Sequence, residues 1–146
     1  MGNEKEPVRV FLESYWEMRK DIVRLQDKIK DLEDLCYQAT SQITGMPGGG
    51  GSGGSKGVWD ALADTRSKAL TTLRAAIRRC EEIETFIAKV DDPVYRKLLQ
   101  YRYISGYTMH RIAEELNYDE RSIYRIRDSA LEAAKLMWDE LANIKK

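Results

Sequence analysis

The chain has 146 residues, enough for one domain or two small ones with a modest buried core. Its 24 lysines and arginines balance 24 aspartates and glutamates, and the mean hydropathy is −0.55. No apolar run approaches the roughly 18 residues of a membrane span, and the polar N-terminus is unlike a secretory signal. We therefore expect a cytoplasmic protein with no membrane partner.

One histidine and two cysteines leave little material for metal sites or histidine-based catalysis. We expect no enzyme activity, and hence no catalytic residue, no cofactor and no metal. The zero net charge lacks the basic excess that is typical of nucleic-acid-binding proteins, so the charge has to be counted segment by segment.

The heptad pattern before residue 44 is the first structural signal. Apolar or small residues step by 4,3,4,3,4,3,4,3,4 through Phe11, Tyr15, Met18, Ile22, Leu25, Ile29, Leu32, Cys36, Ala39 and Ile43. Such a seam predicts a helix of about 35 residues, which Pro7 can begin because its missing N–H costs nothing in the first turn. Leu12, Trp16 and Val23 form a second, sparser apolar line beside the seam, and these side chains must be buried somewhere.

A glycine-rich stretch, Thr44–Gly57 with the sequence TGMPGGGGSGGSKG, is the clearest boundary in the chain. Its composition disfavours both helix and packed strand, so it predicts a flexible loop over residues 44–57. Ser55 precedes Lys56, the reverse of the order in a phosphate-binding P-loop, and no strand comes before it. We expect no nucleotide site there.

A second heptad series follows the glycine-rich stretch. Its steps are 4,3,4,4,3,4,3,4,3, with one extra residue near Ala69–Leu73, through Val58, Leu62, Thr65, Ala69, Leu73, Ala76, Cys80, Ile83, Ile87 and Val90. The extra residue is a stutter in the pattern. Two similar seams joined by a loop predict a long antiparallel helical hairpin over residues 1–91.

The two cysteines test that hairpin. Folding the chain about the loop brings Cys36 near Thr65 and Cys80 near Asp21, so the two thiols are too far apart for a disulfide. We expect two reduced thiols that act as small apolar seam residues.

The last third, residues 92–146, is punctuated by residues that begin and end helices. Asp92, Thr108 and Asp119 can each cap a helix N-terminus, while Gly106 and Asn117 can adopt the left-handed conformation of a turn. The expected helices run from Pro93 to about Ile104, from Thr108 through Leu116, and from Asp119 to Ile144, the last of roughly 25 residues.

The stretch Thr108–Leu131 has the spacing of a helix-turn-helix. Its expected inward side chains are Ile112, Ala113, Leu116, Tyr118, Ile123, Ile126 and Leu131. Its second helix would present its N-terminal half to the major groove of DNA. The candidate DNA-binding residues are Arg111, Arg121, Ser122, Tyr124, Arg125 and Arg127.

A family resemblance supports this interpretation. Leu98–Leu131 is similar to the region-four helix-turn-helix of bacterial sigma factors, and it resembles a family of small phage and prophage proteins related to late-gene transcription regulators. The matching residues are Arg102-Tyr103-Ile104, Gly106, Thr108, Ile112-Ala113, Leu116, Tyr118 and Ala130-Leu131, with Met46-Pro47-Gly48 in the loop. Arg111 stands where the family usually has an acidic residue, so a reciprocal capping box is missing.

Counting the charge by segment weakens the argument against nucleic-acid binding that the zero net charge suggests. Residues 93–146 hold ten lysines and arginines against eight acids, a net of +2, while the first 44 residues hold seven against nine, a net of −2. Arginine can contact guanine or phosphate, but these arginines can also form an ordinary solvated face. Tyr124 can stack on a base, contact a phosphate or pack partly against the protein.

The final helix carries its own apolar series, Ala130, Ala134, Met137, Leu141 and Ile144, with Trp138 alongside. Either this helix packs against the hairpin, or two chains share a helical interface. A dimer is expected, because an excess of +2 allows few phosphate contacts per chain.

The leading hypothesis is an all-α, sequence-specific double-stranded DNA-binding regulator of phage or prophage origin, acting in the bacterial host cell. Two other classes stay open. One is an adaptor that docks on RNA polymerase or a sigma factor, and the other is a DNA-packaging protein like a small terminase subunit, which mass measurement would distinguish as a ring of many subunits.

Overall fold

The computed structural model describes residues 6–44 and 53–144, with side chains for 6–38 and 57–144. The elements are α1 (Pro7–Thr44), α2 (Gly53–Ala88), α3 (Pro93–Leu99), the π-helical η1 (Gln100–Ile104), α4 (Met109–Leu116) and α5 (Glu120–Ile144). The described residues contain no strand, which confirms the all-α fold expected from the sequence.

Two compact units divide the chain. The hairpin unit is Arg19–Arg78, and the composite unit combines Met1–Met18 with Arg79–Lys146. The two units therefore divide both long helices, whereas the sequence suggested a boundary at residues 91 and 92, where the Asp91-Asp92-Pro93 break interrupts the helices. The ends of α1 and α2 belong to the composite unit because they share a core with α3 to α5.

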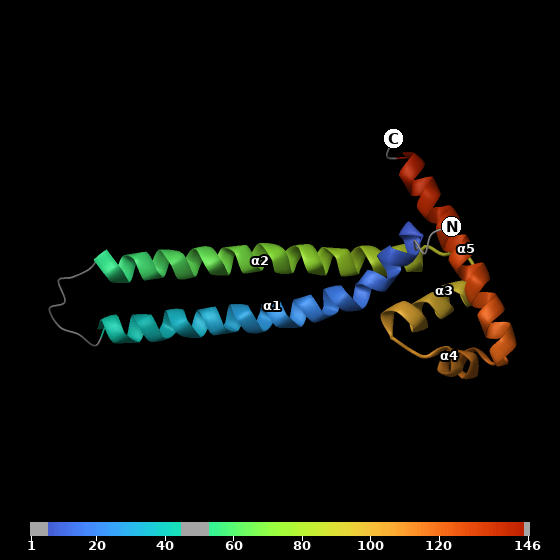
Figure 1. Ribbon diagram of the computed structural model, residues 1–146, viewed down its shortest axis with the longest axis horizontal. Helices are drawn as coiled ribbons and strands as arrows, with labels where there is room; N and C mark the ends of the chain where they lie inside the picture. The colour runs from blue at the N-terminus through green and yellow to red at the C-terminus, as the bar shows by residue number, and fades with distance from the viewer. Residues whose placement is uncertain (1–5, 45–52, 145–146) are drawn as a thin grey trace. The chain divides into compact units, whose positions relative to one another are not determined.

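The hairpin unit consists of the α1 and α2 segments that run side by side in Figure 1. Its buried cluster contains Leu25, Ile29 and Ala69, with Leu70 and Leu73 packed against it. Burial of Ile22, Leu25, Ile29 and Leu32 confirms these positions of the first seam. The stutter near Ala69–Leu73 falls on this cluster, so the extra residue changes the spacing of the seam without exposing Ala69.

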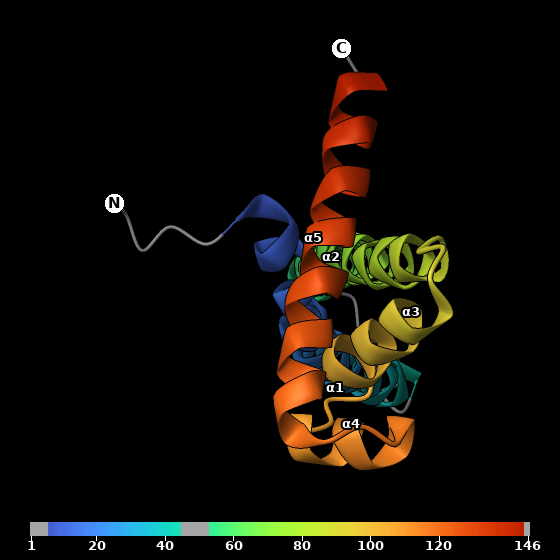
Figure 2. The same cartoon turned by 90° about the vertical axis from the view of Figure 1, so that its right-hand side faces the viewer.

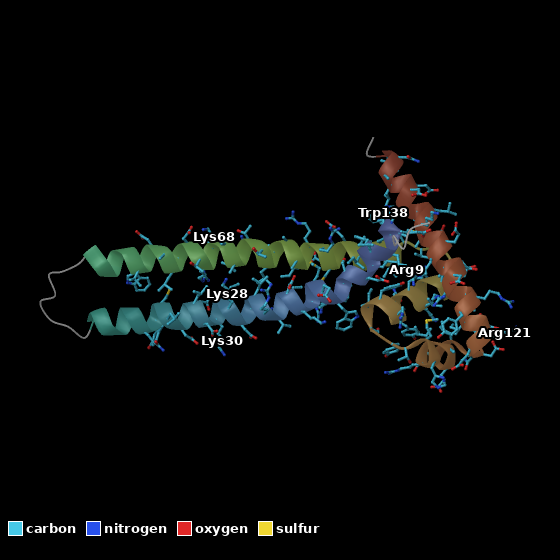
Figure 3. All side chains as sticks on the ribbon, viewed as in Figure 1. Arg9, Lys28, Lys30, Lys68, Arg121 and Trp138 are labelled. Carbon is cyan, nitrogen blue, oxygen red and sulfur yellow. The ribbon has the colours of Figure 1, made fainter. Side chains whose placement is uncertain are left out.

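Ion pairs support the polar sides of the hairpin unit. Arg66 on α2 donates from Nη2 to Oε1 of Glu33 on α1 at 2.9 Å, a contact between the two helices. Lys68, on the side of α2 away from α1 in Figure 3, forms a 3.1 Å pair with Asp64. Both pairs are exposed, so each contributes no more than about 1 kcal/mol.

The expected loop over residues 44–57 is too long. Thr44 is the last residue of α1 and Gly53 the first of α2, so of this stretch only residues 45–52 lie outside the described part of the chain. Met46-Pro47-Gly48 falls within that gap. Helix α2 extends back through Gly53–Gly57 because a formed helix adds residues without a new nucleation step, and glycine disfavours a helix by only about 1 kcal/mol.

The core of the composite unit is dense. The largest fully buried side chains of the described chain all belong to this unit: Val8, Leu12, Ile83, Ile87, Val90, Leu98, Leu99, Ile112 and Ile123. Helix α5 contacts both α3 and α4 in this unit, and Figure 2 shows α4 near the first turns of α5. This core fixes the position of the candidate interface.

An aromatic cluster joins α5 to the hairpin ends within the composite unit. The Trp138 ring lies 4.9 Å from Phe11 and 6.2 Å from Phe86, between ring centroids, and Lys135 pairs with Glu6 at 3.3 Å. Of the two arrangements considered for the last helix, the structure thus has the one in which this helix packs against residues of α1 and α2. Glu6 raises the pKa of Lys135 by hydrogen bonding and by its negative charge.

The apolar line beside the first seam meets three different environments. Leu12 is fully buried and Trp16 packs its ring edge against Gly106, whereas Val23 is 57% exposed. The last apolar series behaves similarly: Ala134 is fully buried, but Leu141 is 42% exposed. The seam of α5 thus continues beyond the core that covers its beginning.

The two cysteines remain thiols, as predicted. Cys36 is half-buried in the hairpin unit, and Cys80 is buried in the composite unit with its Sγ 4.0 Å from the carbonyl oxygen of Tyr15.

Candidate nucleic-acid interface

Helix α3 begins as the sequence predicts and ends differently. The Asp92 side chain accepts from the backbone N–H groups of Val94 at 2.8 Å and Tyr95 at 3.3 Å, and Pro93 occupies the first turn. The expected single helix to Ile104 contains the π-helical segment Gln100–Ile104 instead. There the N–H of Ser105 donates to the carbonyl of Gln100, five residues back.

A left-handed glycine closes this segment. Gly106 has φ +76°, and a Cβ built on it would lie 3.1 Å from Cζ2 of Trp16. The N–H of Tyr107 donates to the carbonyl of Tyr101 at 2.9 Å, so the turn brings residues 101 and 107 together. Their rings are stacked, with centroids 5.2 Å apart and planes inclined by 13°.

Helix α4 is capped at both ends by the residues that the sequence indicates. Thr108 Oγ1 accepts from the backbone N–H of Arg111 at 3.2 Å. Asn117 adopts the left-handed conformation, with φ 60° and ψ 45°, and its N–H reaches the carbonyls of Ala113 and Glu114. The tight turn after α4 follows from this conformation, which asparagine tolerates better than most residues.

Helix α5 begins at a second well-defined cap. The Asp119 carboxylate accepts from the backbone N–H of Ser122 at 2.7 Å. Hydrogen bonds from the Ser122 side chain and backbone hold the pKa of Asp119 below its usual value. Ser122, a candidate DNA-binding residue, is half-buried and already serves this cap.

The packing between α4 and α5 follows most of the expected inward pattern. Ile112, Ala113 and Ile123 are buried, while Leu116, Ile126 and Leu131 are half-buried. Tyr118 was expected to point inward and is 40% exposed. It directly follows the left-handed Asn117, so its side chain leaves the helix within the turn rather than on the apolar face of α4.

The first turns of α5 expose the polar residues that the sequence singles out. Arg121, Tyr124 and Arg125 are exposed on the side of α5 away from buried Ile123. Figure 3 places Arg121 near the N-terminal end of α5. At 3.6 residues per turn, positions 121, 124, 125 and 128 share one face. This face is available to a partner.

The candidate arginines fall into two groups. Arg127 donates from Nη2 to the carboxylate of Asp128 at 3.0 Å, and its Cζ lies 5.0 Å from the Tyr124 ring centroid. In contrast, within residues 6–38 and 57–144 no carboxylate lies within 4.0 Å of Arg111, Arg121 or Arg125. Within those residues, these three guanidiniums therefore form no ion pair.

Arg111 is held by an aromatic ring. Its Cζ lies 3.7 Å from the centroid of Tyr107, the ring that also stacks on Tyr101. Arg102 reaches the same residue from η1, donating from Nη1 to the carbonyl of Tyr107 at 3.3 Å. The sequence reasoning missed this arrangement. Tyr101 and Tyr107, which lie before and after the turn at Gly106, are the signal that could have indicated it.

His110 links the two helices of the motif. Its Nε2 lies 3.0 Å from Oε1 of Glu114, and its Nδ1 lies 2.9 Å from Oε1 of Glu120 on α5. The hydrogen bond and the negative charge of Glu120, together with the charge of Glu114, raise the pKa of His110. The four-residue spacing of His110 and Glu114 in the sequence is typical of such pairs, but nothing in the sequence indicates the contact with Glu120 on α5.

Other kinds of site have less support in the part of the chain that was described. No group of three or more histidine, cysteine or acidic side chains there could hold a metal ion. None of its helices combines the length and apolar character that crossing a membrane requires.

A comparison with known protein families places part of the chain in one of them. The family described as "Protein of unknown function (DUF1492)" matches residues 38–135, more than half of the chain. That range includes the end of α1, all of α2, α3, η1 and α4, and α5 as far as residue 135. No curated protein matches the chain. No solved structure matches it either.

Proposed function

The chain belongs to the DUF1492 family, and we propose that it binds double-stranded DNA sequence-specifically through α4 and α5. The observation that carries the proposal is the pair of exposed guanidiniums, Arg121 and Arg125, on the first turns of α5. No carboxylate of the described residues lies within 4.0 Å of either. The resemblance to sigma-factor region four supports the same role.

Helix α5 is the recognition helix of this proposal. Its N-terminal turns enter the major groove, where Arg121 and Arg125 contact base edges or phosphates and Tyr124 packs beside them. Arg127 contributes less, because Asp128 already binds its guanidinium. Ser122 fixes the start of the helix through Asp119 and reaches DNA only beside that cap.

Helix α4 crosses the DNA backbone in this arrangement. Arg111 on α4 contacts phosphate, which positions the protein without reading sequence. The composite unit thereby separates base contacts on α5 from backbone contacts on α4, as helix-turn-helix proteins do.

A regulator of phage or prophage transcription, in the cytoplasm of a bacterial host, is the biological role that we propose. The net charge of +2 over residues 93–146 limits the number of phosphate contacts per chain. We therefore propose a dimer on a pseudo-palindromic site with half-sites about 10 base pairs apart, or a multiple of that spacing. The apolar end of α5, including Leu141, is available for pairing.

Binding to a site selected from random duplexes tests the proposal. Arg121→Ala and Arg125→Ala should each cost about 1–3 kcal/mol on the selected site and relax the preference at one base position. Arg74→Ala is the matched control, since Arg74 is an exposed arginine of the hairpin unit. If no motif is enriched and no duplex binds even at low salt, the proposal is wrong.

Two outcomes would redirect the function to other classes. A polymerase subunit or sigma factor that copurifies with wild type and equally with the Arg121→Ala/Arg125→Ala protein would favour an adaptor. A ring of many subunits by native mass measurement, with sequence-tolerant DNA binding, would favour a packaging protein.

A further inference from the structure

The residues around Tyr107 carry a second inference, which rests on the proposed DNA-binding function. We propose that Arg102 and Arg111, assembled on Tyr107, form a binding site for one phosphate of the DNA backbone. The site lies within the composite unit and is built by η1, the turn at Gly106 and the first turn of α4.

Two guanidiniums converge on one residue there. Arg111 places its Cζ 3.7 Å from the Tyr107 ring centroid, and Arg102 Nη1 lies 3.3 Å from the Tyr107 carbonyl oxygen. Arg102 and Arg111 are both exposed, and within the described part of the chain neither has a carboxylate within 4.0 Å. Two cations without an ion-pair partner among the described residues, both in contact with Tyr107, favour binding of an anion beside it.

The donors of both side chains remain available. A guanidinium has five N–H groups in one plane, and stacking its flat face on an aromatic ring leaves those groups free at the edge. Arg102 gives one N–H to the Tyr107 carbonyl and retains the others. A tetrahedral phosphate can accept such forked donors from two directions.

The backbone around Tyr107 is fixed before any ligand arrives. The N–H of Ser105 donates to the carbonyl of Gln100, and the N–H of Tyr107 donates to the carbonyl of Tyr101. The residues before and after Gly106 are therefore both hydrogen-bonded to η1. Trp16 packs on Gly106 at the centre of this turn. The Tyr101 ring stacks on Tyr107, and a held Arg111 loses little conformational freedom on binding.

Glu114 and Glu120, two acids near the site, are engaged with His110 rather than with either arginine. Glu114 lies on α4 one turn from Arg111, but its carboxylate is 3.0 Å from Nε2 of His110. Glu120 is engaged with the other ring nitrogen of His110 at 2.9 Å. His110 thus engages both carboxylates, and neither of them pairs with Arg111.

The role assigned to Tyr107 is positioning, while Arg102 and Arg111 bind. This separates the site from the recognition helix: its contribution is independent of DNA sequence, whereas that of Arg121 and Arg125 depends on it. Because both arginines serve one phosphate, their contributions to salt dependence are shared rather than additive.

Binding of the full chain to a random-sequence duplex, titrated with salt, tests the proposal. Arg111→Ala and Arg102→Ala should each weaken binding about tenfold at low salt, equally for random and selected duplexes. The double variant should lower the slope of log K against log salt by about 0.9, the value for one phosphate rather than two. Arg74→Ala should bind like wild type.

Tyr107 variants test positioning. Tyr107→Phe keeps the ring and should bind like wild type, whereas Tyr107→Leu keeps both charges and should weaken binding with little change in slope. Arg111→Lys keeps the charge without the planar stack and should fall between wild type and Arg111→Ala. Circular dichroism checks the folding of every variant, and if Tyr107→Leu is unfolded, the Arg111→Lys comparison decides the positioning role.

The outcomes separate this inference from the proposed function. If wild type binds duplex DNA but the Arg102 and Arg111 variants bind like Arg74→Ala, the phosphate site is wrong and the DNA-binding function stands. A loss confined to one base sequence, or a slope change near 1.8 in the double variant, also overturns the single-phosphate site. If wild type binds no duplex at low salt, both proposals fail.

Discussion

The hairpin unit and the composite unit bury their side chains in different ways. In the hairpin unit two helices meet along one narrow seam, and its buried residues Ile22, Leu25, Ile29 and Leu32 keep 5–9% exposure. In the composite unit several helices converge, and the exposed fraction is zero for Leu98, Leu99, Ile112 and Ile123. Two helices alone leave each seam residue beside solvent, whereas a residue packed among three or more helices is completely enclosed.

This difference explains where a binding site can be built. A fully packed core holds α4 and α5 in fixed register, so the guanidiniums they expose have defined positions relative to one another. A narrow seam supports a long helix pair and leaves its sides polar, with pairs such as Arg66 with Glu33 and Lys68 with Asp64. The proposed recognition surface accordingly belongs to the composite unit and not to the hairpin unit.

The largest expected effect follows from that contrast in burial. Ile123→Ala removes a side chain with zero exposure and should lower the free energy of unfolding of the composite unit by about 2–5 kcal/mol. Val23→Ala, at a 57% exposed position of the hairpin unit, should change stability by less than about 0.5 kcal/mol. Chemical denaturation with amide hydrogen exchange, which assigns the change to a unit, measures both.

Equal losses for the two variants would contradict the contrast. So would a loss for Ile123→Ala that hydrogen exchange places in the hairpin unit and not in the composite unit.

Two glycines offer a sharper comparison, because the same substitution should act with opposite sign. Gly106→Ala forces a Cβ into a left-handed residue and to within 3.1 Å of Trp16, so it should destabilise the protein by about 1–3 kcal/mol. Gly57→Ala places a methyl group in open space on α2 and should stabilise its helix by up to about 1 kcal/mol. Thermal unfolding followed by circular dichroism gives both signs.

A stabilising Gly106→Ala would show that the turn before α4 differs from the one described. It would also remove the support for the fixed backbone around Tyr107.

The smallest effect concerns pH and the link between α4 and α5. Glu120 and Glu114 raise the pKa of His110 above its usual value of 6.5, so the protonated imidazole is stabilised in the folded state. That stabilisation is fully present below the unfolded pKa and is lost as pH rises through the raised folded pKa. Wild type should therefore exceed His110→Gln in stability more at pH about 5.5 than at pH about 8.5.

Titration of the His110 imidazole by NMR checks the cause. Glu120→Gln should shift the pKa of His110 back toward 6.5, since it removes the charge of the first contributor. An unchanged pKa in that variant would contradict the contact between α4 and α5.

The local signals in the sequence predicted the composite unit well where one residue decides one conformation. Asp92, Thr108 and Asp119 each accept backbone N–H bonds at helix starts, and Gly106 and Asn117 are left-handed. Capping chemistry acts over three or four residues, so it can be read from a single stretch of chain.

Other features could not be predicted from the sequence, either because they depend on residues distant in the chain or because they leave no mark on the periodicity. The packing of Trp16 on Gly106 joins residues far apart in the chain, and nothing in the periodicity indicates the π-helical segment. The glycine-rich start of α2 was missed for a related reason: helix propagation from Val58 onward outweighs the local preference of glycine. Division of the long helices between two units also depends on what packs against their ends.

The most direct test of the central claim is amide NMR on the full chain during titration with duplex DNA at low salt. The account predicts chemical-shift changes in η1, α4 and the first turns of α5, with residues 57–78 of the hairpin unit unchanged. Changes concentrated in the hairpin unit, or none anywhere in the chain at saturating DNA, would contradict the assignment of recognition to the composite unit.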